Sequence, residues 1–208
     1  MAIRVRKYKP APTDEYGDYR DILRDDFDYS CAYCNITETE LGNLRLFHID
    51  HYRPQKNPRF PQFAKLKNAY DNLLYSCFDC NEHKGNFWPD LLHKAFHPDH
   101  YVINPCDEDA ELHLNKSQPL WTHITKTGEW NIKRLHLRDE LKLRCRKARE
   151  SHHKKLQQAQ QHRAKAQTML STALSSHNQT AADFFLESIG LANAAIDECH
   201  KFLNRKLA

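Results

Sequence analysis

The early part of the chain shows two different spacings of apolar residues. In residues 14–27 they recur every three or four positions, which predicts a short helix with one apolar face. Residues 44–50, LRLFHID, instead alternate, with Leu44, Leu46 and His48 on one side, as in a strand. The helical positions are Tyr16, Tyr19, Ile22, Leu23 and Phe27.

The middle of the chain predicts short elements separated by loops. Residues 52–69 contain three prolines among five lysines and arginines, which predicts a basic loop. The segment NLLYSC leads into NEHKGN, which favours a short helix that stops at Gly85. Further on, LWTHITKTGEWNI, residues 120–132, favours two short strands joined by a turn at Thr127 and Gly128.

The last third of the chain has a helical pattern. From about Arg138 to Ser175 it is low in glycine and proline, and SSHNQT then interrupts it. The final helix repeats apolar residues with a regular four–three spacing, so the two helices predict an antiparallel hairpin. Neither apolar stripe is bulky, which leaves room for a partner surface to complete the packing. The repeating positions are Phe185, Ile189, Ala192, Ile196, Cys199 and Leu203.

The composition fits a packed protein that does not enter a membrane. The 208 residues are enough for one large domain or two small ones, and 40% of them are hydrophobic. No run of about 18 apolar residues is present, so we expect no membrane span. The basic start, residues 1–12, has no apolar stretch behind it, so we expect no secretory signal. A cytoplasmic location with reduced thiols is the resulting expectation.

The net charge of +4 is unevenly distributed. Residues 131–170 hold twelve lysines and arginines against three acids, whereas residues 14–28 hold seven acids against two arginines. A local basic excess favours a polyanionic partner such as nucleic acid. A solvated helix face explains the excess equally well. A further interpretation is that the basic helix, residues 138–175, docks on a protein.

Four of the seven cysteines form two C-x-x-C pairs, Cys31 with Cys34 and Cys77 with Cys80. Under reducing conditions this favours metal binding over disulfides. Four thiolates suit a tetrahedral zinc ion with no open position, so the predicted site is structural and contributes to folding. One pair alone would be weaker evidence, because redox dithiols use the same spacing. The other cysteines, Cys106, Cys145 and Cys199, are predicted to be small buried residues.

Between and after these pairs lie groups that a zinc ribbon does not need. Asp50 and Asn81 offer the oxygen ligands that a hard divalent ion prefers. His51, next to Asp50, suits a general base that takes a proton from water near neutral pH. Arg53 and Lys84 are candidates for binding flanking phosphates. Together these residues predict metal-assisted hydrolysis of a phosphodiester.

The pattern C-x-x-C, D-H-x-x-P, N-L, C-x-x-C-N-x-x-K-G, over about residues 31–86, resembles the HNH nuclease motif with its ββα-metal fold. The resemblance implies that Asp50 and Asn81 bind the catalytic ion, that His51 is the general base and that the four cysteines bind zinc. It also implies that Asn72 braces the loop carrying the histidine. Some family members have a histidine in place of Asn81 and another one turn later, where this chain has Gly85. That departure favours Mg²⁺ or Mn²⁺ over zinc as the catalytic ion.

Longer stretches are similar to PtuB, the small HNH subunit of Septu-type antiphage defence systems. The resemblance implies an ATPase partner of the ABC or SMC type, sometimes together with a retron. The stretches are FHIDHYRPQK, AYDNLLYSCFDCNEHKGN, VINPCDEDAELHL and TGEWNIKRLHLRDELKLR, which reach about residue 144.

We therefore predict an α+β protein with three parts. Residues 1–12 are a basic tail, residues 13–105 a zinc-braced ββα-metal nuclease domain, and residues 106–208 a mostly helical region that binds a partner or nucleic acid. The predicted function is an endonuclease acting on DNA within an antiphage complex. One alternative is a stand-alone HNH restriction or nicking enzyme. Another is a catalytically silent zinc-bound adaptor for nucleic acid or protein, which would have no use for Asp50 and His51.

Three further histidines have more than one interpretation. His48 is either a packed strand residue or a third metal or phosphate ligand. His93 and His97 lie four residues apart, a spacing that binds metal on a helix. No third ligand is evident for this pair, so a surface position is the simpler interpretation.

Overall fold

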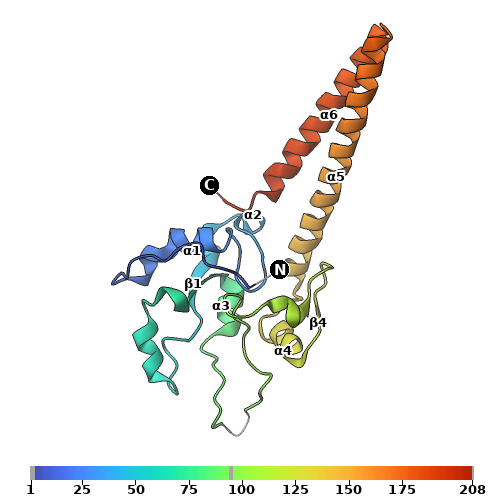
Figure 1. Cartoon of the computed structure of the whole chain (residues 1–208). Coiled ribbons are helices and arrows are strands. Elements are labelled where there is room, and N and C mark those ends of the chain that lie inside the picture. The colour runs from blue at the N-terminus through green and yellow to red at the C-terminus, as the bar shows by residue number, and fades with distance from the viewer. Residues whose placement is uncertain (1–2, 94–95, 208) are drawn as a thin grey trace. The chain divides into compact units, whose positions relative to one another are not determined.

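The computed structural model describes residues 3–93 and 96–207 (Figure 1). The chain divides into a core unit, residues 1–145 with 205–208, and a hairpin unit, residues 146–204. In chain order the helices and strands are α1 (Arg20–Asp26), α2 (Glu38–Leu41), β1 (Phe47–His51), β2 (Leu73–Cys77), α3 (Phe78–Lys84), β3 (Leu114–Asn115), β4 (Thr122–His123), α4 (Lys126–Arg134), α5 (Glu140–Ser175) and α6 (Gln179–Leu203).

Strands β1 and β2 form an antiparallel pair that α3 follows at once. Their register places Asp50 opposite Leu74 and His51 opposite Leu73. All five residues of β2 are buried, and both α1 and α3 contact this strand. As the sequence predicts, α3 stops at Gly85, whose φ of 53° is easily adopted by glycine. The end of β1 therefore lies next to α3.

Large apolar side chains around β2 form the centre of the core unit. Tyr19, Leu23 and Phe27, from the segment that the helical pattern predicts, are all buried. Phe47 of β1 stacks on Tyr75 of β2, with ring centroids 4.9 Å apart. Each side chain of this kind contributes about 1.5–3 kcal/mol by leaving water. This packing fixes the two strands and, through them, the polar residues at their ends.

Residues 3–12, expected to be a flexible basic tail, contain no helix or strand but are bonded to the core unit. The backbone amide of Lys7 donates to the buried carboxylate of Asp26 at 2.7 Å. The guanidinium of Arg6 donates to the carbonyl of Leu73 at 2.6 Å. A backbone amide and a basic side chain of this segment therefore attach it to an acidic group and a carbonyl group of the core unit.

Strand β1 begins later than the alternation of residues 44–50 predicts. Leu44–Leu46 form a 3-10 turn, and the strand starts only at Phe47. The side chain of Asn43 accepts a hydrogen bond from the amide of Arg45 at 2.9 Å. Such a local bond competes with strand pairing. The strand prediction is therefore wrong for the first three residues and right for the rest.

The prediction of two strands and a turn over residues 120–132 is largely wrong. A short strand, β4, does pair with β3, but a helix, α4, begins at Lys126. The hydroxyl of Thr125 caps this helix by accepting from the amide of Gly128 at 3.1 Å. A Cβ atom on Gly128 would lie 1.9 Å from the carbonyl oxygen of His113. Gly128 thus permits close packing of a helix instead of forming a turn.

The hairpin unit has the antiparallel α5–α6 arrangement that the sequence predicts (Figure 1). Asn178 caps α6 by accepting from the amide of Ala181 at 3.0 Å. Near the other end, His152 stacks flat on Phe202 at 3.6 Å between centroids. Phe184 and Leu191 are exposed. Arg146 is buried, and the other buried residues of the described hairpin are mostly small: Ala166, Ala173, Ala182, Ala192, Ile196 and Cys199.

The prediction of an α+β fold with a helical hairpin at its C-terminal end is confirmed. The division between the two compact units falls within α5, and not between residues 105 and 106. The segment that follows residue 105 therefore contributes β3, β4 and α4 to the core unit. Within the described part of the chain, no helix combines the length and apolar character needed to cross a membrane.

Candidate active site and metal centre

Cys31, Cys34, Cys77 and Cys80 come together in the core unit, as the two sequence pairs predict. All four are buried, and their sulfur atoms lie within 4.8 Å of one another. The sulfurs of Cys34 and Cys77 are 3.7 Å apart. Two ligands of a tetrahedral zinc ion, with Zn–S bonds of about 2.3 Å, would be about 3.8 Å apart. The donor set therefore fits a structural zinc ion.

A buried ammonium group, that of Lys142, lies beside the cysteine cluster. Burial raises the pKa of the Cys80 thiol. For Cys31, burial acts in the same direction, but hydrogen bonds with the neighbouring thiols lower its pKa well below the usual value. Lys142 is buried and pairs with Asp79. Burial lowers the pKa of the Lys142 ammonium, but the nearby sulfurs of Cys80 and Cys34 raise it, and the net change is upward. Four thiolates around one dication carry a net negative charge, which this ammonium offsets.

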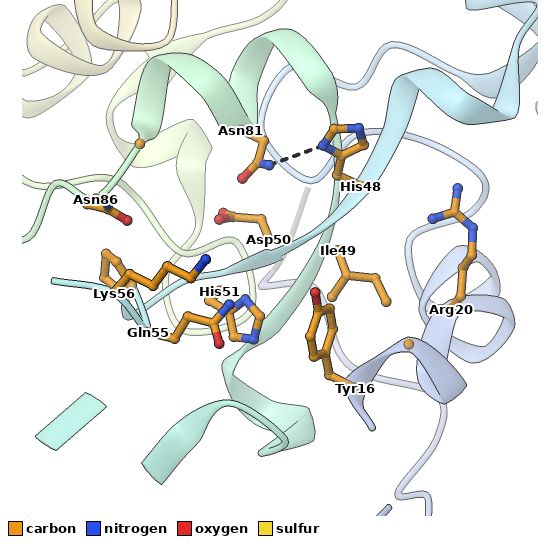
Figure 2. A pocket seen from close by; sticks show the side chains of 13 residues that line it. Tyr16, Arg20, His48, Ile49, Asp50, His51, Gln55, Lys56, Asn81 and Asn86 are labelled. Carbon is orange, nitrogen blue, oxygen red and sulfur yellow. Dashed lines mark hydrogen bonds between the residues drawn. The ribbon is translucent and has the colours of Figure 1, made fainter. Parts of the chain in front are cut away.

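A pocket of about 510 Å³ opens beside β1 and α3. His48 and Asp50 extend from β1 toward Asn81 of α3, whereas His51 lies on the side of Tyr16 (Figure 2). Successive side chains of a strand point to opposite faces. The end of β1 therefore supplies the pocket with polar groups from two directions.

One ring nitrogen of His51 forms a hydrogen bond that holds the ring, and the other is left to accept a proton. Its Nε2 lies 2.9 Å from the carbonyl oxygen of Lys67, which can only accept, so Nε2 carries the proton and Nδ1 is the basic atom. The Tyr16 ring meets the imidazole at 74°, with centroids 4.8 Å apart, and limits its rotation. Burial lowers the pKa of His51, so the ring is neutral at neutral pH and ready to accept a proton.

Asp50 is buried, and both of its carboxylate oxygens are bonded. Oδ1 accepts from the ammonium of Lys84 at 2.9 Å, and Oδ2 accepts from the hydroxyl of Tyr33. Burial, together with the neighbouring carboxylate, raises the pKa of Tyr33 and keeps it a donor. A carboxylate oxygen has two lone pairs, so these bonds orient Asp50 and still leave positions for a cation.

Asn81 faces Asp50 from the first turns of α3. Its side-chain nitrogen lies 3.4 Å from Nδ1 of His48, so the amide donates to the imidazole and its oxygen is left for the pocket (Figure 2). His48 is further held by the edge of the Phe78 ring, at 5.4 Å between centroids. His48 thus orients Asn81, and the two oxygen-bearing side chains predicted to bind a divalent ion line the same pocket.

Residues 31–87 match the family model described as HNH endonuclease. They form an HNH endonuclease domain. The matched range begins at the first cysteine of the cluster and extends beyond α3, so it includes both cysteine pairs, both strands of the site and the pocket residues on β1 and α3. The family acts with a divalent metal, which indicates metal-dependent nuclease activity. No curated protein and no solved structure matches the chain.

Asn72 of the HNH domain forms hydrogen bonds with the backbone just after β1. Its side-chain oxygen accepts from the amide of Arg53 at 2.9 Å, and its nitrogen donates to the carbonyl of the same residue at 3.1 Å. Its own carbonyl accepts from the amide of Tyr52 at 2.9 Å. The chain directly after His51 is thereby fixed. The Arg53 side chain is exposed, with its guanidinium 5.7 Å from the centre of the Trp88 ring.

The sequence suggests that Lys84 contacts a phosphate, but the structure places its side chain elsewhere. Its side chain is 1% exposed and its ammonium bonds the Asp50 carboxylate and, at 2.8 Å, the carbonyl of His51. A buried ammonium paired in this way is not presented to a surface ligand. Lys84 instead neutralises Asp50 and joins α3 to the end of β1.

Sequence reasoning misses several residues of the HNH domain and its surroundings. Tyr33 lies between the first two cysteines, so the zinc knuckle itself orients Asp50. The apolar pattern places Tyr16 only on the face of a helix, and it gives no sign that Arg20 and Lys56 also line the pocket. The tyrosine inside C-A-Y-C is a usable signal, because a phenol buried beside metal ligands needs a hydrogen-bond partner.

Proposed function

We propose that the protein is a metal-dependent endonuclease that hydrolyses phosphodiester bonds in DNA. The observation that carries this proposal is the meeting, in one pocket, of the basic Nδ1 of His51 with the oxygen donors Asp50 and Asn81. The match of residues 31–87 to the HNH endonuclease model supports the same chemistry.

His51 performs the proton transfer in this proposal. Its Nδ1 takes a proton from a water molecule as the water oxygen attacks phosphorus and the bond from phosphorus to the leaving oxygen breaks. The carbonyl of Lys67 accepts a hydrogen bond from Nε2 throughout. The imidazolium that forms is therefore stabilised on its far side. Because burial lowers its pKa, His51 begins the reaction unprotonated at neutral pH.

Asp50 and Asn81 would bind the divalent ion. A carboxylate and an amide oxygen are hard donors, which favour Mg²⁺ or Mn²⁺ over a softer ion. When bound, such an ion polarises the phosphate and stabilises charge on the leaving oxygen. The cysteine cluster would leave its zinc ion no open position, so its role is structural. Arg20 and Lys56 add positive charge to the pocket, which favours a polyanionic substrate.

We also propose that the nuclease works in an antiphage complex with an ATPase of the ABC or SMC type. The support is the similarity of stretches up to about residue 144 to the Septu subunit. The hairpin unit adds exposed apolar residues, Phe184 and Leu191, that a partner would cover. If the tagged chain, expressed with its genomic neighbours, isolates such an ATPase in a fixed ratio, the proposal stands. Site-specific cleavage by the chain alone, with no such ATPase isolated, would favour a stand-alone restriction or nicking enzyme.

The catalytic proposal is tested by nicking of a supercoiled plasmid with Mg²⁺ or Mn²⁺. We expect His51→Ala to slow nicking by on the order of 10²-fold or more, because the general base is lost. His123→Ala changes an exposed histidine in β4 and is the matched control, with an unchanged rate. Equal rates for wild type and His51→Ala, with zinc retained, would overturn the mechanism. Absence of nicking by the wild type would favour a silent adaptor.

A further inference from the structure

A second pocket, of about 470 Å³, adjoins the catalytic pocket. Asn86 lines both of them. The loop that supplies residues 54–56 to the catalytic pocket continues directly into residues 57–59, which line the second. The side chain of Asn57 donates to the carbonyl of Asn86 at 2.8 Å and joins the two walls. The two pockets are therefore neighbours along the same pair of chain segments.

Flat rings form much of the second pocket. Trp130, His100 and His97 form a column of nearly parallel rings. The ring centroids of Trp130 and His100 are 5.6 Å apart, with 20° between the ring planes. Those of His100 and His97 are 4.3 Å apart, with 21° between the planes. His100 and His97 line the pocket, and the side chain of His97, at one end of the column, is 45% exposed. Phe87 and Trp88 also line it. A further planar ring would extend this column in the way that nucleic acid bases stack on aromatic side chains.

The polar groups at this pocket also fit a nucleotide. Arg59 is 56% exposed at its side chain and lies 3.3 Å from Asp90, so its guanidinium remains accessible to solvent and to a phosphate. A metal site fits less well. Nδ1 of His97 accepts from the amide of Asp99. In residues 3–93 and 96–207, the four cysteines are the single group of three or more His, Cys, Asp or Glu side chains that lie close enough together to bind an ion.

We propose that this second pocket binds an unstacked base of the nucleic acid whose phosphodiester lies in the catalytic pocket. This inference rests on the proposed nuclease function and narrows its substrate to strands that are single or locally unpaired. A base inside a duplex is stacked and paired, so it must leave the helix before it can enter a side pocket. Two pockets with a common wall suit two successive parts of one strand.

Binding without cleavage tests the inference. Fluorescence anisotropy, with no added divalent ion, would compare labelled dT15 with a 15-unit abasic strand that has the same phosphates but no bases. We expect the wild type to bind dT15 about tenfold more tightly, in line with about 1–3 kcal/mol per stacked base. The duplex of dT15 with dA15 keeps its bases stacked and paired, so His97→Ala should leave the affinity for the duplex unchanged.

Variants at His97 then localise the effect. His97→Ala should remove most of the preference for dT15, and His97→Phe should restore it, because a planar ring returns. His123→Ala should keep it. Equal affinity of the wild type for dT15 and the abasic strand, or a preference that survives in His97→Ala, would overturn the inference. If plasmid and oligonucleotide cleavage fail while the base preference holds, the nuclease proposal fails and the base site stands.

Discussion

The core unit and the hairpin unit bury different kinds of side chain. The core unit buries charged groups, among them Asp50, Lys84 and Glu38, and pairs them with partners from distant parts of the chain. Among the described residues, the hairpin unit buries one charged side chain, that of its first residue, Arg146, and otherwise alanine, isoleucine and cysteine. Buried charges are costly unless paired, but pairing fixes their positions. In the core unit, the burial of paired charges costs free energy but fixes the positions of reactive groups. The hairpin unit only needs two helices to associate.

Loss of zinc should give the largest difference in stability between the two units. We expect Cys77→Ser to lose the zinc ion and most amide-exchange protection in the core unit, because the binding energy of a structural zinc site is comparable to the whole stability of a domain. Protection in α5 and α6 beyond residue 146 should persist. Zinc content and hydrogen exchange followed by mass spectrometry measure both. Cys199→Ser, a buried cysteine of the hairpin unit, is the control and should retain zinc. Retained protection of the core in Cys77→Ser would contradict the comparison.

Removal of one partner of a buried ion pair should have the next largest effect. Lys84→Met leaves the Asp50 carboxylate buried without its cation, which we expect to cost about 3–5 kcal/mol of unfolding free energy. Lys154 in the hairpin unit pairs with Glu150 at 2.7 Å but is mostly exposed, so Lys154→Met should change stability by less than about 0.5 kcal/mol. Urea unfolding of both variants gives the two values. Similar losses in the two variants would remove the distinction between the units.

The pH dependence of cleavage tests the environment of the base. His51 must be unprotonated to act, so the rate should fall about tenfold for each pH unit below its pKa. Burial lowers that pKa, so the acid limb should lie below the value of about 6.5 for a free imidazole. Single-turnover rates from acid to neutral pH locate the midpoint. A midpoint at or above that value would show that His51 is not buried as described or is not the base.

The smallest effect is expected at the helix cap of the hairpin unit. Asn178→Ala removes the side-chain acceptor for the amide of Ala181 and should cost about 1 kcal/mol locally. Amide exchange at the start of α6 should accelerate, with zinc content and cleavage unchanged. Glu187→Ala, at an exposed position inside the same helix, is the control and should be neutral or slightly stabilising. A loss of cleavage in Asn178→Ala would mean that the units are energetically coupled.

Short-range patterns predicted much of the fold and of the candidate site. The spacing of apolar residues was sufficient for α1, α5 and α6, because a helix places every third and fourth residue on one face. It failed at Gly128, whose role depends on the close approach of His113 from another segment. A glycine that makes room for packing has the same appearance in a sequence as a glycine in a turn.

The sequence by itself determined which chemical groups are present: two cysteine pairs, an adjacent Asp50 and His51, and the oxygen donor Asn81. Spacing and residue type are enough for this, since ligand preference is a property of the side chain. Only the tertiary structure decided how each group is used. The carbonyl of Lys67 determines which nitrogen of His51 is basic, and burial turns Lys84 from a candidate phosphate ligand into the counter-ion of Asp50. Protonation, orientation and accessibility depend on atoms that folding brings together from distant parts of the chain.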